Sequence, residues 1–169
     1  MKRINVLGNS GSGKSTFARL IGERLQIPVV HLDQLFWEPG WQQADADLFR
    51  RRVANALSGE TWICEGNYSN RTFDLRVPVA DLNIWLETPR LTCAIRILIR
   101  SARLKARPDL PAGCAEGDIR NAINLVRYAW RFDAAQRGRV DAELARWVAP
   151  NRVVHLRDRN QIAQFLGDL

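Results

Sequence analysis

The sequence is poor in cysteine and has no long apolar run, and both absences narrow what the chain can be. Its three cysteines, Cys64, Cys93 and Cys114, are far apart and form no C-x-x-C pair, so neither a disulfide framework nor a zinc site is expected. No stretch approaches the roughly 18 uninterrupted apolar residues of a membrane span. The chain begins with a methionine, two basic residues and a short apolar run, which is not the pattern of a secretory signal. We therefore expect a cytoplasmic protein with reduced thiols and no membrane segment.

Lysine is also scarce, because arginine makes up 22 of the 25 basic residues, and the formal net charge is +7. The planar guanidinium of arginine matches the geometry of phosphate, so this composition suits a protein that handles phosphorylated molecules. The same positive charge also suits binding to nucleic acid. Composition does not separate these two interpretations.

Short apolar runs alternate with helical patterns along the chain. The runs cover residues 4–7, 29–32, 61–64, 82–86 and 153–156. This alternation predicts an α/β fold in which helices cover a parallel sheet, and the length suits one domain over residues 1–169. Between residues 100 and 117 the pattern changes to an arginine-rich stretch with proline and glycine, which we interpret as a lid. A long helical region follows over about 118–147, with a break near Gly138. Four apolar residues are spaced for its buried face: Ile119, Ile123, Val126 and Trp130.

The strongest motif follows the first apolar run. Residues 8–15 match G-x-x-x-x-G-K-[ST], the phosphate-binding loop, or P-loop, that joins a strand to a helix. Glycines let the backbone form a nest of N–H groups around phosphate, and the helix N-terminus adds positive potential. Lys14 is expected to reach the β- and γ-phosphates of ATP, and Ser15 to offer its hydroxyl to Mg2+. The predicted nucleotide-binding residues here are Gly8, Asn9, Ser10, Gly11, Ser12, Gly13, Lys14, Ser15 and Thr16.

Two acidic residues stand directly after apolar runs, Asp33 after the second and Glu65 after the third. The carboxyl ends of parallel strands face the ligand crevice in such sheets, so both acids can converge near Lys14. We assign Asp33 to the phosphate acceptor, whose hydroxyl proton it would take, and Glu65 to a water bound to Mg2+, with the reverse assignment open. The alternative is that each acid only caps the helix that follows.

The region of about residues 33–76 is the predicted acceptor side of the site. The predicted substrate-binding residues in it are Asp33, Trp37, Asn67, Tyr68 and Arg71. The tryptophans of its aromatic loop either wall a substrate pocket or belong to the core. Arg76 either joins the substrate-binding set or only lies at the surface.

Arg96 and Arg100 are four residues apart in the helical pattern after the fourth apolar run and therefore share a face. Cations in such a position stabilise the charge that spreads over the γ-phosphate during transfer. Arg100 is therefore a predicted catalytic residue together with Lys14 and Asp33. The alternative is a solvated basic face.

The chain also carries a family pattern. Besides the P-loop, this pattern consists of the His31-Leu32-Asp33 turn, the aromatic loop from Phe36 to Trp41, the Glu65-Gly66-Asn67-Tyr68 turn, the segment from Trp85 to Arg90 and the arginine-rich segment from Arg107 to Glu116. From Lys2 to Leu166 the chain resembles the adenylate-kinase-like P-loop proteins that are often labelled DNA topology modulation proteins. True adenylate kinases place an arginine in the loop after the second strand, whereas this chain has aromatic residues and Glu38 there. Adenylate is therefore not the expected phosphate acceptor.

The resemblance implies a P-loop NTPase three-layer sandwich similar to that of nucleoside monophosphate kinases. Its sheet would have five parallel strands in the order 2-3-1-4-5, with a helical lid after strand 4. The resemblance also implies nucleotide contacts for Arg96 and Arg100 at the base of the lid. It places Arg157 in the loop that contacts adenine.

These observations together predict a kinase, a Mg2+-dependent phosphotransferase that moves a phosphoryl group from ATP to a small molecule which the sequence does not identify. Two other interpretations stay open. One is a nucleotide-gated regulatory protein whose basic surface engages nucleic acid or a partner, and the other is slow ATP hydrolysis without a phosphate acceptor. No recognisable nucleic-acid reader is present, so nucleic acid is not an expected partner.

Overall fold

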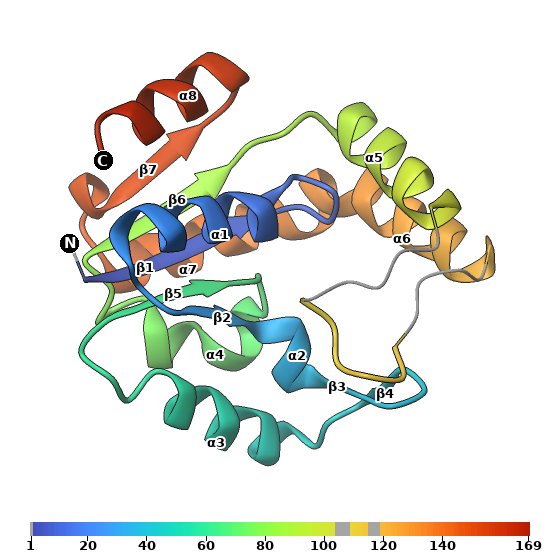
Figure 1. The fold of residues 1–169 in the computed structure, drawn as a ribbon, viewed down its shortest axis with the longest axis horizontal. Coiled ribbons are helices and arrows are strands. Elements are labelled where there is room, and N and C mark those ends of the chain that lie inside the picture. Colours follow the sequence, from blue (N-terminus) through green and yellow to red (C-terminus); the bar gives the residue numbers. More distant parts are fainter. Residues whose placement is uncertain (1, 104–108, 115–118) are drawn as a thin grey trace.

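The computed structural model describes residues 2–103, 109–114 and 119–169. Within these ranges the main sheet has five parallel strands: β1 (Arg3–Gly8), β2 (Val29–His31), β5 (Trp62–Glu65), β6 (Leu82–Leu86) and β7 (Val153–Leu156). Their order is β2-β5-β1-β6-β7 (Figure 1), which confirms the predicted order 2-3-1-4-5. Each predicted apolar run forms a strand, but β2 is shorter than expected because Leu32 begins a helix.

Helices cover both faces of the sheet (Figure 1). Both faces are apolar because side chains alternate along strands such as β1. Ile4 and Val6 pack against α1 (Lys14–Leu25) and α8 (Arg159–Gly167). Leu7 points to the other face and packs with residues of α4 (Ser69–Arg76) and α7 (Gly138–Trp147). The remaining elements are α2 (Leu32–Phe36), β3 (Trp37–Glu38), β4 (Gln42–Gln43), α3 (Ala46–Ala56), α5 (Arg90–Ala102), α6 (Ile119–Phe132), the π-helical turn η1 (Asp133–Arg137) and the short 3-10 turn η2 (Pro150–Arg152).

The long helical region is present as α6, η1 and α7, and the change from η1 to α7 occurs at Gly138, where a break was predicted. The prediction of which residues form the buried face of α6 is mostly wrong. Ile119 is 68% exposed and Ile123 and Trp130 are also exposed, whereas Ala122, Ala129 and Phe132 are buried. Alanine lies at the interface because α6 packs along α5, and small side chains let two helices approach closely.

Two findings concern the cysteines and the lengths of the helices. All three cysteines are free and buried, and burial raises the pKa of Cys64 and of Cys93 to about 11. Across residues 2–103, 109–114 and 119–169, no helix combines the length and the apolarity needed to cross a lipid bilayer.

Arg76, which the sequence left between a substrate-binding role and the surface, is completely buried at the end of α4. Its guanidinium donates to Oδ1 of Asn5 at 3.2 Å and to the carbonyl oxygen of Gly66 at 2.8 Å. It also donates to Thr72 Oγ1 and to the carbonyl oxygen of Asn67. Burial lowers the pKa of Arg76, since the charged form loses water. The side chain therefore ties α4 to β1 and to the turn after β5.

We expect Arg76→Met to destabilise the fold strongly. The substitution leaves several buried oxygens without their donor, and the free energy of unfolding should fall by about 3 kcal/mol. For a chain of this size that corresponds to a melting temperature lower by roughly 6–12 °C. Thermal unfolding followed by circular dichroism measures the effect, with Arg24→Met on the exposed face of α1 as the matched control. Equal melting temperatures for the two variants would contradict the structural role of Arg76.

Candidate functional site

A cavity of about 580 Å³ lies among the segments that follow β1, β2 and β5. Its walls also include side chains of α5 and α6 and of the segment 109–114. Carboxyl ends of parallel strands are where ligands bind in open α/β sheets. The sequence predicted convergence at this place, and the cavity is where Lys14 and Asp33 are brought together.

The P-loop reaches its shape through glycines in the left-handed region of backbone conformation. Gly11 has a φ of 77°, and a Cβ there would lie 2.5 Å from the carbonyl oxygen of Cys93 on α5. Gly13 has a φ of 97° and is the N-cap of α1. Any larger residue at Gly11 would separate the loop from α5, so both the turn and the close approach require glycine.

Two thirds of the predicted nucleotide-binding loop lines the cavity and the rest supports it. The lining residues are Ser10, Gly11, Gly13, Lys14, Ser15 and Thr16. The other three residues make hydrogen bonds to neighbouring segments. Asn9 Nδ2 donates to the carbonyl oxygen of Ala129 at 2.7 Å, and the backbone of Gly8 bonds to Asn67. The carbonyl oxygen of Ser12 accepts from Thr88 Oγ1 at 3.1 Å. The supporting residues thus fix the loop between β6 and α6.

The end of the cavity formed by the P-loop, α1 and α5 is rich in cationic side chains. Lys14, Ser15 and Thr16 form the first turn of α1, whose N–H groups point out of the helix and carry its positive dipole potential. Arg96 and Arg100 of α5 line the same cavity, and their predicted contacts with the nucleotide stay predictions. Arg96 Nη1 donates to the carbonyl oxygen of Ser12 at 2.9 Å, so it also braces the loop. This arrangement has the charge and the donors that a triphosphate requires.

Asp33 lies at the end of the cavity walled by aromatic rings, hydrogen-bonded to Tyr68. The Tyr68 hydroxyl donates to Asp33 Oδ1 at 2.7 Å. Burial and the neighbouring charge of Asp33 raise the pKa of Tyr68, so Tyr68 stays a protonated donor. The same two causes raise the pKa of Tyr128, on α6. Tyr68 therefore orients the carboxylate that was predicted to face the phosphate acceptor.

Trp37 and Trp41 both line the cavity, and Trp37 also packs against the core cluster that contains Phe36. They belong to a β-hairpin formed by β3 and β4 rather than to a plain loop. Their ring centroids are 5.4 Å apart with an angle of 76° between the planes. The hairpin thus forms one wall of the site, while Phe36 joins it to the core.

Two predicted substrate-binding residues have other contacts. Asn67 lines the cavity, but its amide is engaged by the backbone of Gly8, with Nδ2 donating at 2.8 Å and Oδ1 accepting at 3.0 Å. Arg71 is not among the described residues that line the cavity. Its guanidinium lies over the ring of Phe36, 5.3 Å from the centroid.

Glu65, predicted to hold a water on Mg2+, is buried and is not among the described residues that line the cavity. Its Oε1 lies 2.8 Å from Nδ1 of His31, and its Oε2 has no hydrogen-bond partner among the residues that the structure describes. A buried carboxylate oxygen without a partner is a group that a metal-bound water would satisfy, and Ser15, whose hydroxyl is a suitable ligand, lines the cavity, so the residue types present fit Mg2+. The described residues contain no cluster of His, Cys, Asp or Glu able to hold a metal by itself.

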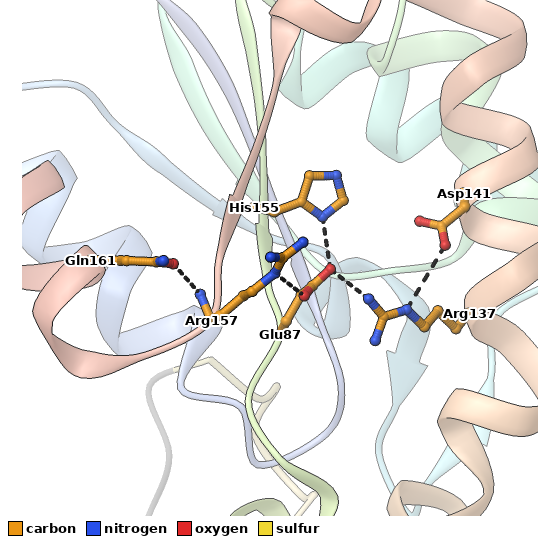
Figure 2. Close-up of polar contacts among 6 residues, drawn as sticks. All are labelled: Glu87, Arg137, Asp141, His155, Arg157 and Gln161. Carbon is orange, nitrogen blue, oxygen red and sulfur yellow. Dashed lines mark hydrogen bonds and ion pairs between the residues drawn. The ribbon is translucent and has the colours of Figure 1, made fainter.

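Arg157, predicted to contact adenine, belongs to a cluster around Glu87 (Figure 2). Arg157 Nε pairs with Glu87 Oε2 at 2.9 Å, and Arg137 Nη2 with Glu87 Oε1 at 2.6 Å. Nδ1 of His155 lies 2.8 Å from the same Oε1. The Glu87 side chain is only 8% exposed, so this carboxylate joins the end of β6 to β7 and η1. An adenine contact for Arg157 stays a prediction.

The Glu87 cluster predicts a component of stability that is lost in acid. Burial by itself raises the pKa of Glu87, but hydrogen bonds from His155 and Arg157 and the charge of Arg137 outweigh it and lower the pKa below the ordinary 4.5. A depressed carboxyl pKa stabilises the folded state above the ordinary value, and this contribution disappears as the pH falls through the folded pKa. We expect Glu87→Gln to lower the free energy of unfolding by about 1 kcal/mol at pH 7 and by much less near pH 3. Urea denaturation at both pH values measures this, with exposed Glu23→Gln as the control. A difference that is the same at both pH values would contradict the linkage.

The lid prediction is only partly covered by the structure. Residues 100–102 continue α5, while 104–108 and 115–118 lie outside the described residues. The segment 109–114 lies beside the β3–β4 hairpin (Figure 1), where the N–H of Gly40 donates to the carbonyl oxygen of Gly113 at 3.2 Å. Cys114 Sγ lies 3.1 Å from the carbonyl oxygen of Glu38. This segment therefore closes one side of the cavity.

Several cavity residues were missed by sequence reasoning. They are Arg19, Gln43, Asp109, Leu110, Leu125 and Tyr128. No local motif marks them, since each reaches the cavity only through the packing of the element that carries it: α1 for Arg19, β4 for Gln43, α6 for Leu125 and Tyr128, and the segment 109–114 for Asp109 and Leu110.

Solved structures with this fold include several small-molecule kinases. The chain is similar to a shikimate kinase from Bacteroides thetaiotaomicron, with a TM-score of 0.57, 16% identity, and coverage of 99% of this chain and 95% of that chain. A gluconokinase from Sinorhizobium meliloti 1021 gives a TM-score of 0.53 at 17% identity, covering 99% of this chain and 88% of that one. A sugar kinase from Janibacter sp. HTCC2649 gives a TM-score of 0.51 at 18% identity, covering 99% of this chain and 91% of that one.

Identities this low establish the shared fold and no more. No protein-family model matches the chain, and no curated protein matches it either. The solved structures agree with the expected P-loop kinase fold, whereas the association with DNA topology finds no support in them.

Proposed function

We propose that this protein is a kinase that transfers the γ-phosphoryl group of ATP to a hydroxyl of a small molecule. The observation that carries the proposal is a single cavity that contains both the P-loop lysine, Lys14, and the carboxylate of Asp33. Arg96 and Arg100 line the same cavity, so positive charge to stabilise the phosphates and a base for the hydroxyl are available together. The fold shared with proteins described as small-molecule kinases supports the same class of reaction.

In this proposal each end of the cavity has its own task. The first-turn N–H groups of α1 and Lys14 bind the β- and γ-phosphates. The hydroxyl oxygen of the substrate attacks the γ-phosphorus, the bond to the β-phosphate oxygen breaks, ADP leaves, and the hydroxyl proton passes to Asp33. Arg100 stabilises the charge that spreads over the transferred group. Mg2+ would neutralise phosphate charge when bound, held by the Ser15 hydroxyl and, through water, by Glu65.

Measurement of ADP release tests the proposal. Purified protein with ATP and Mg2+ is assayed alone and with a panel of small hydroxyl compounds, and we expect at least one compound to accelerate ADP release and to appear as its phosphate ester. ADP release that no compound changes would favour hydrolysis without an acceptor and contradict the proposal. Affinity for nucleic acid that responds to ATP and falls steeply with salt would favour the nucleotide-gated alternative.

A further inference from the structure

Arg19, in the second turn of α1, is a cationic residue of the cavity lining. Among the described residues its side chain is half-buried and makes no hydrogen bond and no ion pair. It differs in this from Arg96, whose Nη1 donates to the carbonyl oxygen of Ser12. A guanidinium that has lost part of its water and has no partner favours a negatively charged ligand, which restores its hydrogen bonds.

Helical spacing fixes the side of α1 on which Arg19 lies. Ser15, Arg19 and Gly22 are four and three residues apart, so they form one row along the helix. A Cβ on Gly22 would lie 2.6 Å from Val29 Cγ2, so this row faces β2. Phe17 lies on the opposite flank, and its ring centroid is 6.0 Å from that of an aromatic residue of α8. Arg19 is therefore on the β2 side of α1.

The β2 side is the acceptor side of the proposed site. β2 continues directly into α2, whose first turn carries Asp33. The opposite flank of α1 faces α8, which begins shortly after Arg157, the residue predicted to contact adenine. Side chains on a helix lean toward its N-terminus, so Arg19 extends from the second turn back toward Ser15 and the cavity. Its charge is thus placed beside the phosphates on the side where the acceptor enters.

We infer that Arg19 binds a negatively charged group, a carboxylate or a phosphate, of the hydroxyl compound that accepts the phosphoryl group. The guanidinium fork matches both groups and donates two parallel hydrogen bonds to either. Such a contact fixes one end of the acceptor while its hydroxyl group is oriented for transfer. This inference rests on the proposed kinase function, because it names the class of substrate for the same site.

Binding of matched probes tests the charge preference without any turnover. The protein is first saturated with Mg2+ and a non-hydrolysable ATP analogue, so that the P-loop is occupied and does not bind the probes. The probes are para-hydroxymethyl-benzoate, para-hydroxymethyl-phenyl phosphate and the uncharged para-hydroxymethyl-benzyl alcohol. We expect calorimetric titration at pH 7 to give at least one anion an affinity about 10-fold or more above that of the alcohol. The tighter anion then distinguishes a carboxylate site from a phosphate site.

The opposite results are equally clear. An alcohol that binds as tightly as both anions, or more tightly, would overturn the inference. Failure of all three probes to bind would overturn it as well.

Variants of α1 assign the preference to Arg19. Arg19→Met keeps most of the stem and should bring the anion-to-alcohol affinity ratio to near unity, whereas Arg19→Lys should retain part of it. ATP affinity of Arg19→Met should change by less than about 3-fold, because a charge outside the phosphate contacts acts only through a screened field. Arg24→Met, exposed on the same helix, is the matched control and should keep the parent ratio.

Circular dichroism verifies that each variant is folded. An unchanged ratio in folded Arg19→Met would overturn the assignment to Arg19. A loss of ATP affinity as large as the loss of anion affinity would overturn it too, because Arg19 would then be a nucleotide contact.

The two proposals fail in different ways. Formation of phosphate esters is measured with the same probes, ATP and Mg2+. Anion binding that depends on Arg19, without a phosphate ester of these or of other hydroxyl compounds, would contradict the kinase function. Ester formation on the uncharged alcohol in preference to both anions would leave the kinase function intact and overturn the substrate class.

Discussion

Lys14→Met is expected to weaken ATP binding by about 100-fold and to lower kcat by about 1,000-fold or more. In the described part of the chain, Lys14 is the one lysine that lines the cavity, and it stands in the first turn of α1, where the P-loop ends. Its ammonium group makes charge-assisted contacts with phosphate oxygens, which are among the strongest hydrogen bonds in proteins. Arg96 does not replace it, because its Nη1 already donates to the carbonyl oxygen of Ser12.

Calorimetric titration with ATP and Mg2+ measures the first effect, and ADP release with the best phosphate acceptor measures the second. Lys2→Met is the matched control, since Lys2 is exposed and its ammonium group lies 3.8 Å from Glu60. The control should leave both quantities within about 2-fold of the parent value, as expected for a surface substitution. If Lys14→Met bound ATP as tightly as the control does, the P-loop would not be the nucleotide site.

Asp33→Asn is expected to lower kcat by about 100- to 10,000-fold while ATP affinity changes by less than about 2-fold. The amide keeps the size of the side chain but cannot take the hydroxyl proton. It also removes the negative charge that Tyr68 orients through the 2.7 Å bond to Oδ1. The loss therefore belongs to the transfer step and not to nucleotide binding.

Steady-state and single-turnover rates show whether Asp33→Asn slows the transfer step or weakens nucleotide binding. Tyr68→Phe tests the orienting role, and we expect a loss in kcat of roughly 10-fold, smaller than that of Asp33→Asn. Asp47→Asn, on the exposed face of α3, is the matched control and should behave like the parent protein. An Asp33→Asn variant with an unchanged kcat would exclude Asp33 as the base.

Much of the site was predictable because its signals are local. The glycines and Lys14 of the P-loop act through backbone conformation and chemistry within one turn, and a strand-loop-helix context is visible in the periodicity around them. Asp33 was found because a residue at the carboxyl end of a parallel strand has a known place in the fold. The same rule pointed to Glu65, but Glu65 is buried beside His31 and does not line the cavity, since its environment is set by neighbouring strands.

The amino-acid sequence by itself determined the α/β fold, the glycine-rich loop that leads into α1 and the meeting of Lys14 and Asp33 in one cavity. Those properties follow from hydrophobic period and short-range spacing. The tertiary structure alone decided that Arg76 is buried and hydrogen-bonded to β1 and to the turn after β5, and that Asn67 supports Gly8. It also decided that Arg157 pairs with Glu87 and that Tyr128 lines the cavity. Each of these outcomes depends on which distant backbone or side chain meets a polar group once helices pack on the sheet, and burial forces such groups to find those partners.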